Sequence, residues 1–148
     1  MLQVVNMKHN PLGEKAAGDY VKVALEKNNY DFSLNYTTKE SLDNFYFLID
    51  NNEIVGCCGL TFDEIILGKE TSPWITSLHL NQDYRGHNYG QLLINHVIQK
   101  VELLGYDTAY VRTEEKEFYR SQNWTELEGY YAKMRTDQVF YKKLDERL

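Results

Sequence analysis

The stretch SLHLNQDYRGHNYGQLL, residues 77–93, carries the strongest structural signal in the sequence. It begins inside an apolar run from Trp74 to Leu80 that is rich in strand-forming residues. A polar loop covers residues 81–88. Apolar residues then recur at helical spacing from Tyr89 to Leu104, which predicts a helix of about 16 residues. Gly105 stands where a helix end favours a left-handed residue. We therefore expect a strand, a loop and a long helix in direct succession.

The loop Arg85-Gly86-His87-Asn88-Tyr89-Gly90 has the features of an anion-binding site. A helix N-terminus offers unpaired N–H groups and a partial positive charge, and small residues before it let a phosphate approach the backbone. Arg85 adds a charged donor that suits phosphate. The glycine spacing fits neither a Walker loop nor a dinucleotide fingerprint. Taken alone, the loop is equally consistent with a structural turn that contains two glycines.

The same loop resembles the signature of GNAT N-acetyltransferases, (Arg/Gln)-x-x-Gly-x-(Gly/Ala), at the start of their long central helix. Arg85, Tyr89 and Gly90 fit this pattern, whereas Asn88 stands where the family usually has glycine. Asn is the non-glycine residue that best tolerates a positive φ angle. We therefore expect the loop to keep its shape.

Further segments resemble the family in the same order along the chain. Residues 73–80 resemble a fourth strand with the pattern Pro-Trp-(Leu/Ile)-x-Ser-Leu-x-Val, and Ile54-Val55-Gly56 resembles the third strand. Residues 118–124 resemble the ending (Phe/Leu)-Tyr-x-x-x-Gly-(Phe/Trp), with Asn123 in place of a helix-ending glycine. The matching part runs from about residue 45 to about residue 131, and the N-terminal third matches in outline.

The resemblance implies a single N-acetyltransferase domain over residues 1–148 with an α/β (α+β) fold. Its central sheet is mixed and mostly antiparallel, its fourth and fifth strands splay apart, and helices flank it. The residue pattern itself favours a mixed α/β sheet. Beside the elements above it predicts strands at residues 2–7, 45–49, 54–62, 108–112, 127–131 and 138–144, and helices at residues 11–28, near Thr38 and at residues 114–122.

The resemblance also implies acetyl-CoA as a co-substrate and no metal. Main-chain atoms of Leu78 and Leu80 would lie along the pantetheine arm, and the loop would hold the pyrophosphate. The expected coenzyme-binding residues are Leu78, Leu80, Arg85, Gly86, His87, Asn88, Tyr89, Gly90 and Gln91. An acceptor amine would attack the thioester directly in a ternary complex, with the oxyanion stabilised by a backbone N–H of the fourth strand.

Tyr119 matches the family tyrosine that protonates the leaving thiolate, and it is the expected general acid. The alternative is a packed tyrosine on a short helix. The general base is open between His79, Asp63, Glu64, Glu70 and a water chain. His79 lies on the fourth strand, where its side chain faces either the cleft or a helix.

Composition excludes several classes of protein. The 148 residues suit one domain, and the net charge of -6 without a basic patch argues against binding to nucleic acid. Cys57 and Cys58 are adjacent and point to opposite faces of a strand, so we expect packing and no zinc site. Neither a signal peptide nor an apolar run long enough for a membrane span is present, which predicts a cytoplasmic protein.

The acceptor is expected to be a small-molecule or peptide amine. The negative charge and the acidic loop that contains Asp63, Glu64 and Glu70 favour a cationic amine, but fold does not fix the acceptor. A homodimer is one expectation, because dimers are common among such proteins. Two alternative functions stay open: a non-catalytic acyl-CoA-binding regulatory module, and a nucleotide-binding protein of another fold.

Overall fold

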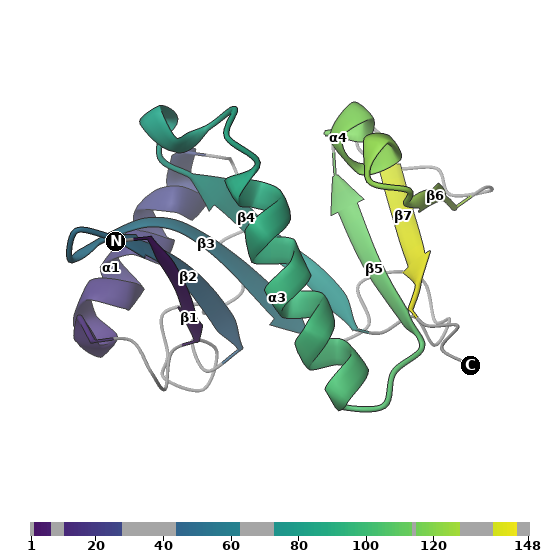
Figure 1. Cartoon of the computed structure of the whole chain (residues 1–148), viewed down its shortest axis with the longest axis horizontal. Coiled ribbons are helices and arrows are strands. Elements are labelled where there is room, and N and C mark those ends of the chain that lie inside the picture. The colour runs from purple at the N-terminus through teal and green to yellow at the C-terminus, as the bar shows by residue number, and fades with distance from the viewer. Residues whose placement is uncertain are drawn as a thin grey trace. The chain divides into compact units, whose positions relative to one another are not determined.

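The computed structural model describes residues 2–6, 11–27, 44–62, 73–113, 115–127 and 138–144. The sheet has seven strands in the order β1-β2-β3-β4-β5-β7-β6 and carries flanking helices (Figure 1). The predicted mixed α/β fold is therefore confirmed. The elements are β1 (Gln3–Asn6), α1 (Gly13–Lys27), β2 (Phe45–Asp50), β3 (Glu53–Thr61), β4 (Trp74–Leu80), the 3-10 helix η2 (Gln82–Tyr84), α3 (Tyr89–Leu103), β5 (Thr108–Thr113), α4 (Lys116–Ser121), β6 (Thr125–Glu126) and β7 (Gln138–Lys143).

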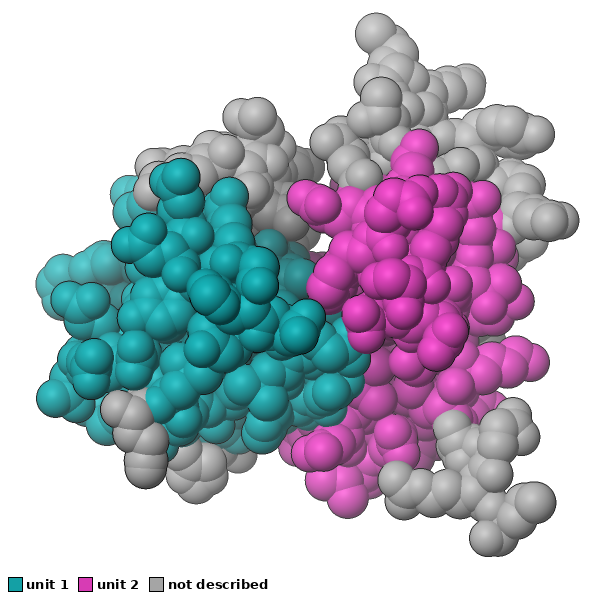
Figure 2. All heavy atoms as spheres, turned by 45° about the horizontal axis from the view of Figure 1, so that its top comes forward, with its two compact units in different colours: residues 1–60, 77–97 teal, residues 61–76, 98–148 magenta. Residues whose placement is uncertain are grey.

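The chain divides into two compact units, which Figure 2 shows in two colours. Unit 1 comprises Met1–Leu60 and Ser77–Val97, and unit 2 comprises Thr61–Thr76 and Ile98–Leu148. The short helix predicted near Thr38 lies outside the described residues, as do the three carboxylates Asp63, Glu64 and Glu70. In the described part of the chain, no helix is both long and apolar enough to cross a membrane.

Unit 1 is built on an antiparallel hairpin of β2 and β3, to which β1 adds. The hairpin turn uses Asn51 and Asn52 at φ angles of 51° and 63°, and two successive left-handed residues match the twist of paired strands. One side of these strands packs against α1, with a core of Ala17, Val21, Ala24, Phe45, Phe47, Ile49 and Cys57. A β-carbon on Gly56 would lie 2.7 Å from Leu80 Cδ2 and 3.2 Å from the His79 carbonyl oxygen. Glycine therefore lets β3 approach the end of β4 closely.

In unit 2 the first residues of β4 pair in parallel with β5, and β7 pairs antiparallel with both β5 and β6. The ladder between β4 and β5 consists of Trp74↔Tyr110 and Ile75↔Val111. Two residues later, Ser77 has a φ angle of 58°. A left-handed residue inside a strand interrupts the regular pleat of β4 at this point.

Most predicted elements are confirmed within two residues of their expected ends. β4 has the bounds expected for it, α3 begins at Tyr89 as expected, and Gly105 beyond it has a φ angle of 91°. The strand expected at residues 127–131 was wrong at its start, because β6 ends at Glu126. Asn123, at a φ angle of 68°, turns the chain so that Thr125 pairs at once with Tyr141. Residues 128–131 lie outside the described part of the chain.

Cys57 and Cys58 are both free and fully buried, as expected for packing residues of a strand. The Cys57 thiol donates to the Ser77 carbonyl oxygen over 3.4 Å. Burial raises the pKa of the Cys57 thiol from 9.0 to about 12. Burial also raises the pKa of the Cys58 thiol. Each buried thiol therefore favours its protonated form in the folded protein.

These raised pKa values predict that the fold loses stability in alkali. Below pH 9 the thiols are protonated in the folded and in the unfolded state, so their contribution to the free energy of unfolding is fully present. Above pH 9 the unfolded state releases thiol protons that the folded state retains, and this contribution is progressively lost. Between about pH 9 and 12, each thiol should lower the free energy of unfolding by up to about 1.4 kcal/mol per pH unit. Urea unfolding from pH 7 to 10.5 in reductant measures this slope, which Cys57→Ala should reduce. Equal slopes in the variant and the wild type would contradict the prediction.

Candidate functional site

The loop between β4 and α3 begins with a tight turn that the backbone holds on both sides. The Asn81 N–H donates to the Val55 carbonyl oxygen of β3 over 2.8 Å. Within the turn, the Tyr84 N–H donates to the Asn81 carbonyl oxygen over 2.9 Å, and the Arg85 N–H donates to the Gln82 carbonyl oxygen over 3.2 Å. The end of β4 and the 3-10 helix η2 therefore set the direction in which the chain enters the loop.

The loop then alternates left-handed and ordinary residues up to the helix. Gly86 and Asn88 have φ angles of 80° and 65°. The expectation that Asn88 can take the backbone conformation of a glycine is confirmed. The first backbone bond at this end of α3 joins the Leu92 N–H to the Asn88 carbonyl oxygen over 3.2 Å. The preceding N–H groups have no carbonyl one helical turn earlier, and they form the positive end of the helix dipole.

The side chains of the loop are placed so that an anion can reach its backbone. Arg85, Gly86, His87 and Asn88 are exposed, whereas Gly90, in the first turn of α3, is buried. The Arg85 Nε donates to the Leu80 carbonyl oxygen over 3.1 Å. The sequence suggested Arg85 only as a hydrogen-bond donor to a phosphate group. The structure shows that its side chain also connects the loop to the end of β4. Its terminal N–H groups remain as further donors.

Aromatic side chains of the loop and of the residues beside it contact one another, and the sequence analysis missed these contacts. The Tyr84 hydroxyl donates to Asp50 Oδ2 over 2.7 Å, which joins η2 to the end of β2 and raises the pKa of Tyr84. The Tyr84 and Tyr89 rings lie 6.1 Å apart, and the His87 and Tyr89 rings 5.6 Å apart. The sequence analysis assigned no role to Asp50. No sequence signal paired it with a tyrosine 34 positions later.

The structure places His79 against α1. Its side chain is buried, at 8% exposure, and its ring lies 6.0 Å from that of Tyr20. Of the two orientations that the sequence left open, His79 thus takes the one that faces a helix. Tyr20 lies in the helix expected at residues 11–28, and its hydroxyl donates to Asn81 Oδ1 over 2.8 Å. Burial raises the pKa of this hydroxyl far above its usual range.

Tyr119 lies on α4 in unit 2, with 2% exposure. Its ring meets those of Phe118 and Trp124 edge-on at 4.9 and 5.3 Å, and lies nearly parallel to that of Phe140 at 6.2 Å. Its carbonyl oxygen accepts the N–H groups of Gln122 and Trp124, both over 3.1 Å. The side chain is therefore fixed by packing, as a structural role and a precisely placed acid would both require.

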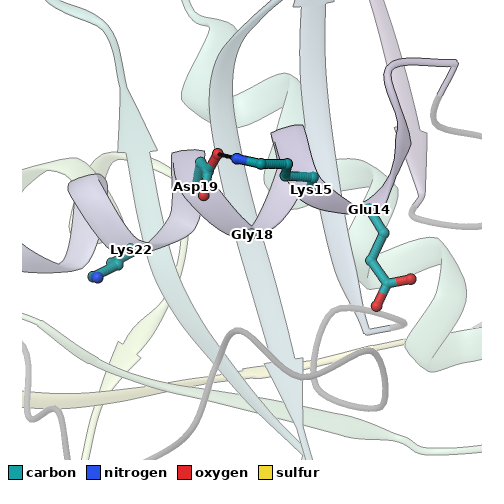
Figure 3. A pocket seen from close by; sticks show the side chains of 5 residues that line it. All are labelled: Glu14, Lys15, Gly18, Asp19 and Lys22. Carbon is teal, nitrogen blue, oxygen red and sulfur yellow. Dashed lines mark hydrogen bonds and ion pairs between the residues drawn. The ribbon is translucent and has the colours of Figure 1, made fainter.

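A separate hollow lies on the exposed face of α1. It is lined by Glu14, Lys15, Gly18, Asp19 and Lys22, and the Lys15 Nζ pairs with Asp19 Oδ2 over 2.8 Å (Figure 3). None of the expected coenzyme-binding residues lines it. Such an exposed pair contributes little to stability, so we treat the hollow as a surface feature. Within the described ranges, no three His, Cys, Asp or Glu side chains gather as a metal site.

Comparisons with known proteins agree with this architecture. Residues 12–131 match the model of the acetyltransferase (GNAT) family. A search of curated protein sequences gave no significant match. Among solved structures, an acetyltransferase of the GNAT family from Staphylococcus aureus Mu50 is similar at a TM-score of 0.70 and 17% identity, over 98% of this chain and 100% of that chain.

Two further solved structures have the same fold at low sequence identity. An aminoglycoside 6'-acetyltransferase type Ii has a TM-score of 0.72 and 18% identity, over 100% of this chain and 99% of that chain. The N-acetylglutamate synthase of Neisseria gonorrhoeae, solved with coenzyme A and N-acetylglutamate, has a TM-score of 0.71 and 12% identity. Here the match covers 99% of this chain and only 36% of that chain.

Proposed function

Because its residues 12–131 match the family model, the chain belongs to the GNAT acetyltransferase family, and we propose that it transfers an acetyl group from acetyl-CoA to a primary amine. The observation that carries this proposal is the loop at residues 85–90, where left-handed Gly86 and Asn88 directly precede the N-terminus of α3. We take residues 1–148 as one acetyltransferase domain in the cytoplasm. In support of one domain, the family match includes residues of both compact units.

The proposed coenzyme site uses mainly backbone groups. The amides of Gly86, His87, Asn88, Tyr89 and Gly90 would hold the pyrophosphate, with the terminal N–H groups of Arg85 beside them. Main-chain atoms of Leu78 and Leu80 would bind the pantetheine arm.

Gln91 would contribute its backbone N–H. Its side-chain Nε2 already donates to Asn95 Oδ1 over 2.7 Å. Its Oε1 is a hydrogen-bond acceptor and therefore does not bind phosphate oxygens, which are acceptors too. This Oε1 is buried without a partner among the described residues.

The chemistry proposed is direct acyl transfer. The amine nitrogen attacks the thioester carbonyl carbon, a C–N bond forms, the C–S bond breaks, and the coenzyme leaves as a thiolate. Tyr119 is the proposed acid that protonates this thiolate, and a base removes the proton lost by the amine. Water and the carboxylates Asp63, Glu64 and Glu70 remain the candidate bases, whereas His79 is the less favoured candidate because its buried side chain faces α1. Positioning of the two substrates supplies much of the rate.

The acceptor class is proposed from charge and from the similar structures. The net charge of -6 favours a cationic amine. The similar structures include an aminoglycoside 6'-acetyltransferase and an N-acetylglutamate synthase solved with L-arginine. A first panel of acceptors should therefore hold aminoglycosides, polyamines, amino acids and lysine peptides.

The test is a calorimetric titration with acetyl-CoA, followed by a thiol-release assay over this panel. We expect saturable binding, displaced by CoA and unaffected by ATP, and turnover with at least one amine. Binding without turnover on any amine would favour the non-catalytic acyl-CoA-binding module. Displacement by ATP would favour a nucleotide-binding protein, and no binding at all would reject the proposed coenzyme site.

A further inference from the structure

A hydrogen bond from α1 reaches Asn81, four residues ahead of the loop at residues 85–90. The Tyr20 hydroxyl donates to Asn81 Oδ1 over 2.8 Å, between residues 61 positions apart in the sequence. Asn81 is also the N-cap residue of η2, where an Asn side chain ordinarily bonds to the N–H groups of its own helix. It makes no such side-chain bond here. Its carboxamide oxygen instead accepts the hydrogen bond from the Tyr20 hydroxyl.

The surroundings of Tyr20 keep this donor in place. Its ring lies against that of His79 on β4, and its hydroxyl is close enough to Arg85 for the guanidinium charge to act on its pKa. Burial outweighs that charge and raises the pKa of Tyr20, so the hydroxyl stays protonated at neutral pH. Tyr20 thus remains a hydrogen-bond donor under any ordinary assay condition.

The backbone hydrogen bonds of Asn81 connect it to β3 and to the segment that leads into the loop. Its N–H is held by the Val55 carbonyl oxygen, and its own carbonyl oxygen accepts the Tyr84 N–H. Tyr84 is fixed in turn by its hydroxyl bond to Asp50. Both ends of the short segment 81–84 are therefore anchored by a tyrosine hydroxyl, one from α1 and one to β2, directly ahead of Arg85 and Gly86. A loop that is ordered before binding pays less entropy when its ligand arrives.

We propose that Tyr20 is a positioning residue, whose hydroxyl holds Asn81 so that the loop at residues 85–90 is preorganised for the coenzyme pyrophosphate. The inference rests on the proposed function. It assigns Tyr20 no contact with substrate. Its effect should therefore appear in the affinity for the coenzyme and in KM for acetyl-CoA, and not in kcat at saturation.

The test compares Tyr20→Phe, Asn81→Ala and the double variant by titration with CoA at a temperature well below their unfolding. Loss of the hydroxyl should weaken CoA binding about tenfold, which corresponds to one hydrogen bond. If the two residues act through one hydrogen bond, the double variant should bind CoA no more weakly than whichever single variant has the lower affinity. Tyr46→Phe is the matched control. Tyr46 is a half-buried tyrosine of the same unit whose hydroxyl has no hydrogen-bond partner among the described residues.

The outcomes separate this inference from the proposed function. Wild-type protein that fails to bind CoA would overturn both. Wild-type binding with Tyr20→Phe within twofold of it would overturn the positioning role alone, as would additive losses in the double variant. Weaker binding by Tyr20→Phe, with kcat retained, no further loss in the double variant and Tyr46→Phe unchanged, would support it.

Discussion

Gly86→Val is expected to weaken acetyl-CoA binding at least about a hundredfold, because valine strongly disfavours a positive φ angle and should force the loop into another conformation. Gly86 has a φ angle of 80°, and its amide is the first of those proposed to hold the pyrophosphate. A hydrogen bond to a charged group is worth about 1.5–3 kcal/mol, so misdirecting two of these amides suffices for such a loss. Calorimetric titration with acetyl-CoA measures the change.

Gly105→Val is the matched control for this experiment. Gly105 has a φ angle of 91°, and among the described residues, chain neighbours aside, no atom lies within 4 Å of a β-carbon added to Gly105 or to Gly86. The two variants therefore introduce similar backbone strain in open space, one ahead of α3 and the other behind it. Both should lower the melting temperature, but Gly105→Val should bind acetyl-CoA within about twofold of wild type. Equal affinity in the two variants would place the coenzyme elsewhere.

Tyr119→Phe is expected to lower kcat about a hundredfold, the lower end of the contribution of a general acid. Phenylalanine keeps the ring and hence the contacts with Phe118, Trp124 and Phe140. Only the hydroxyl is removed, so binding of acetyl-CoA should stay within about threefold of wild type. Steady-state kinetics by thiol release, with the acceptor found in the panel, give the comparison.

The control for Tyr119→Phe is Tyr141→Phe, a half-buried tyrosine on β7 in the same unit. It should leave kcat unchanged. If Tyr119→Phe keeps full kcat while its melting temperature falls, Tyr119 is a packing residue and the thiolate finds its proton in water. If kcat falls, the decrease should be smaller for acyl donors with a more acidic leaving thiol, because these need less assistance from an acid.

Local signals in the sequence were sufficient for the succession of elements around the loop. Strand formers at residues 74–80, helical spacing from Tyr89 and a glycine at position 105 predicted β4, α3 and its end, and all three are present. Asn88 and Asn123 were expected to tolerate glycine conformations, and both have positive φ angles. Such preferences act within a few residues, so they can be interpreted without knowledge of the fold.

The direction and partners of the side chains around the loop depended on contacts between distant segments. Ser77 is left-handed inside β4, and His79 faces α1, although neither follows from residue type. Tyr20 reaches Asn81 across 61 positions, and Tyr84 reaches Asp50 across 34. Local preference fixes the backbone of a short segment, but a hydrogen bond between segments exists only once packing has brought them within about 3 Å. The sequence thus predicted the backbone course of the loop at residues 85–90, and the packing of α1, β2 and β4 decided which contacts hold that loop in place.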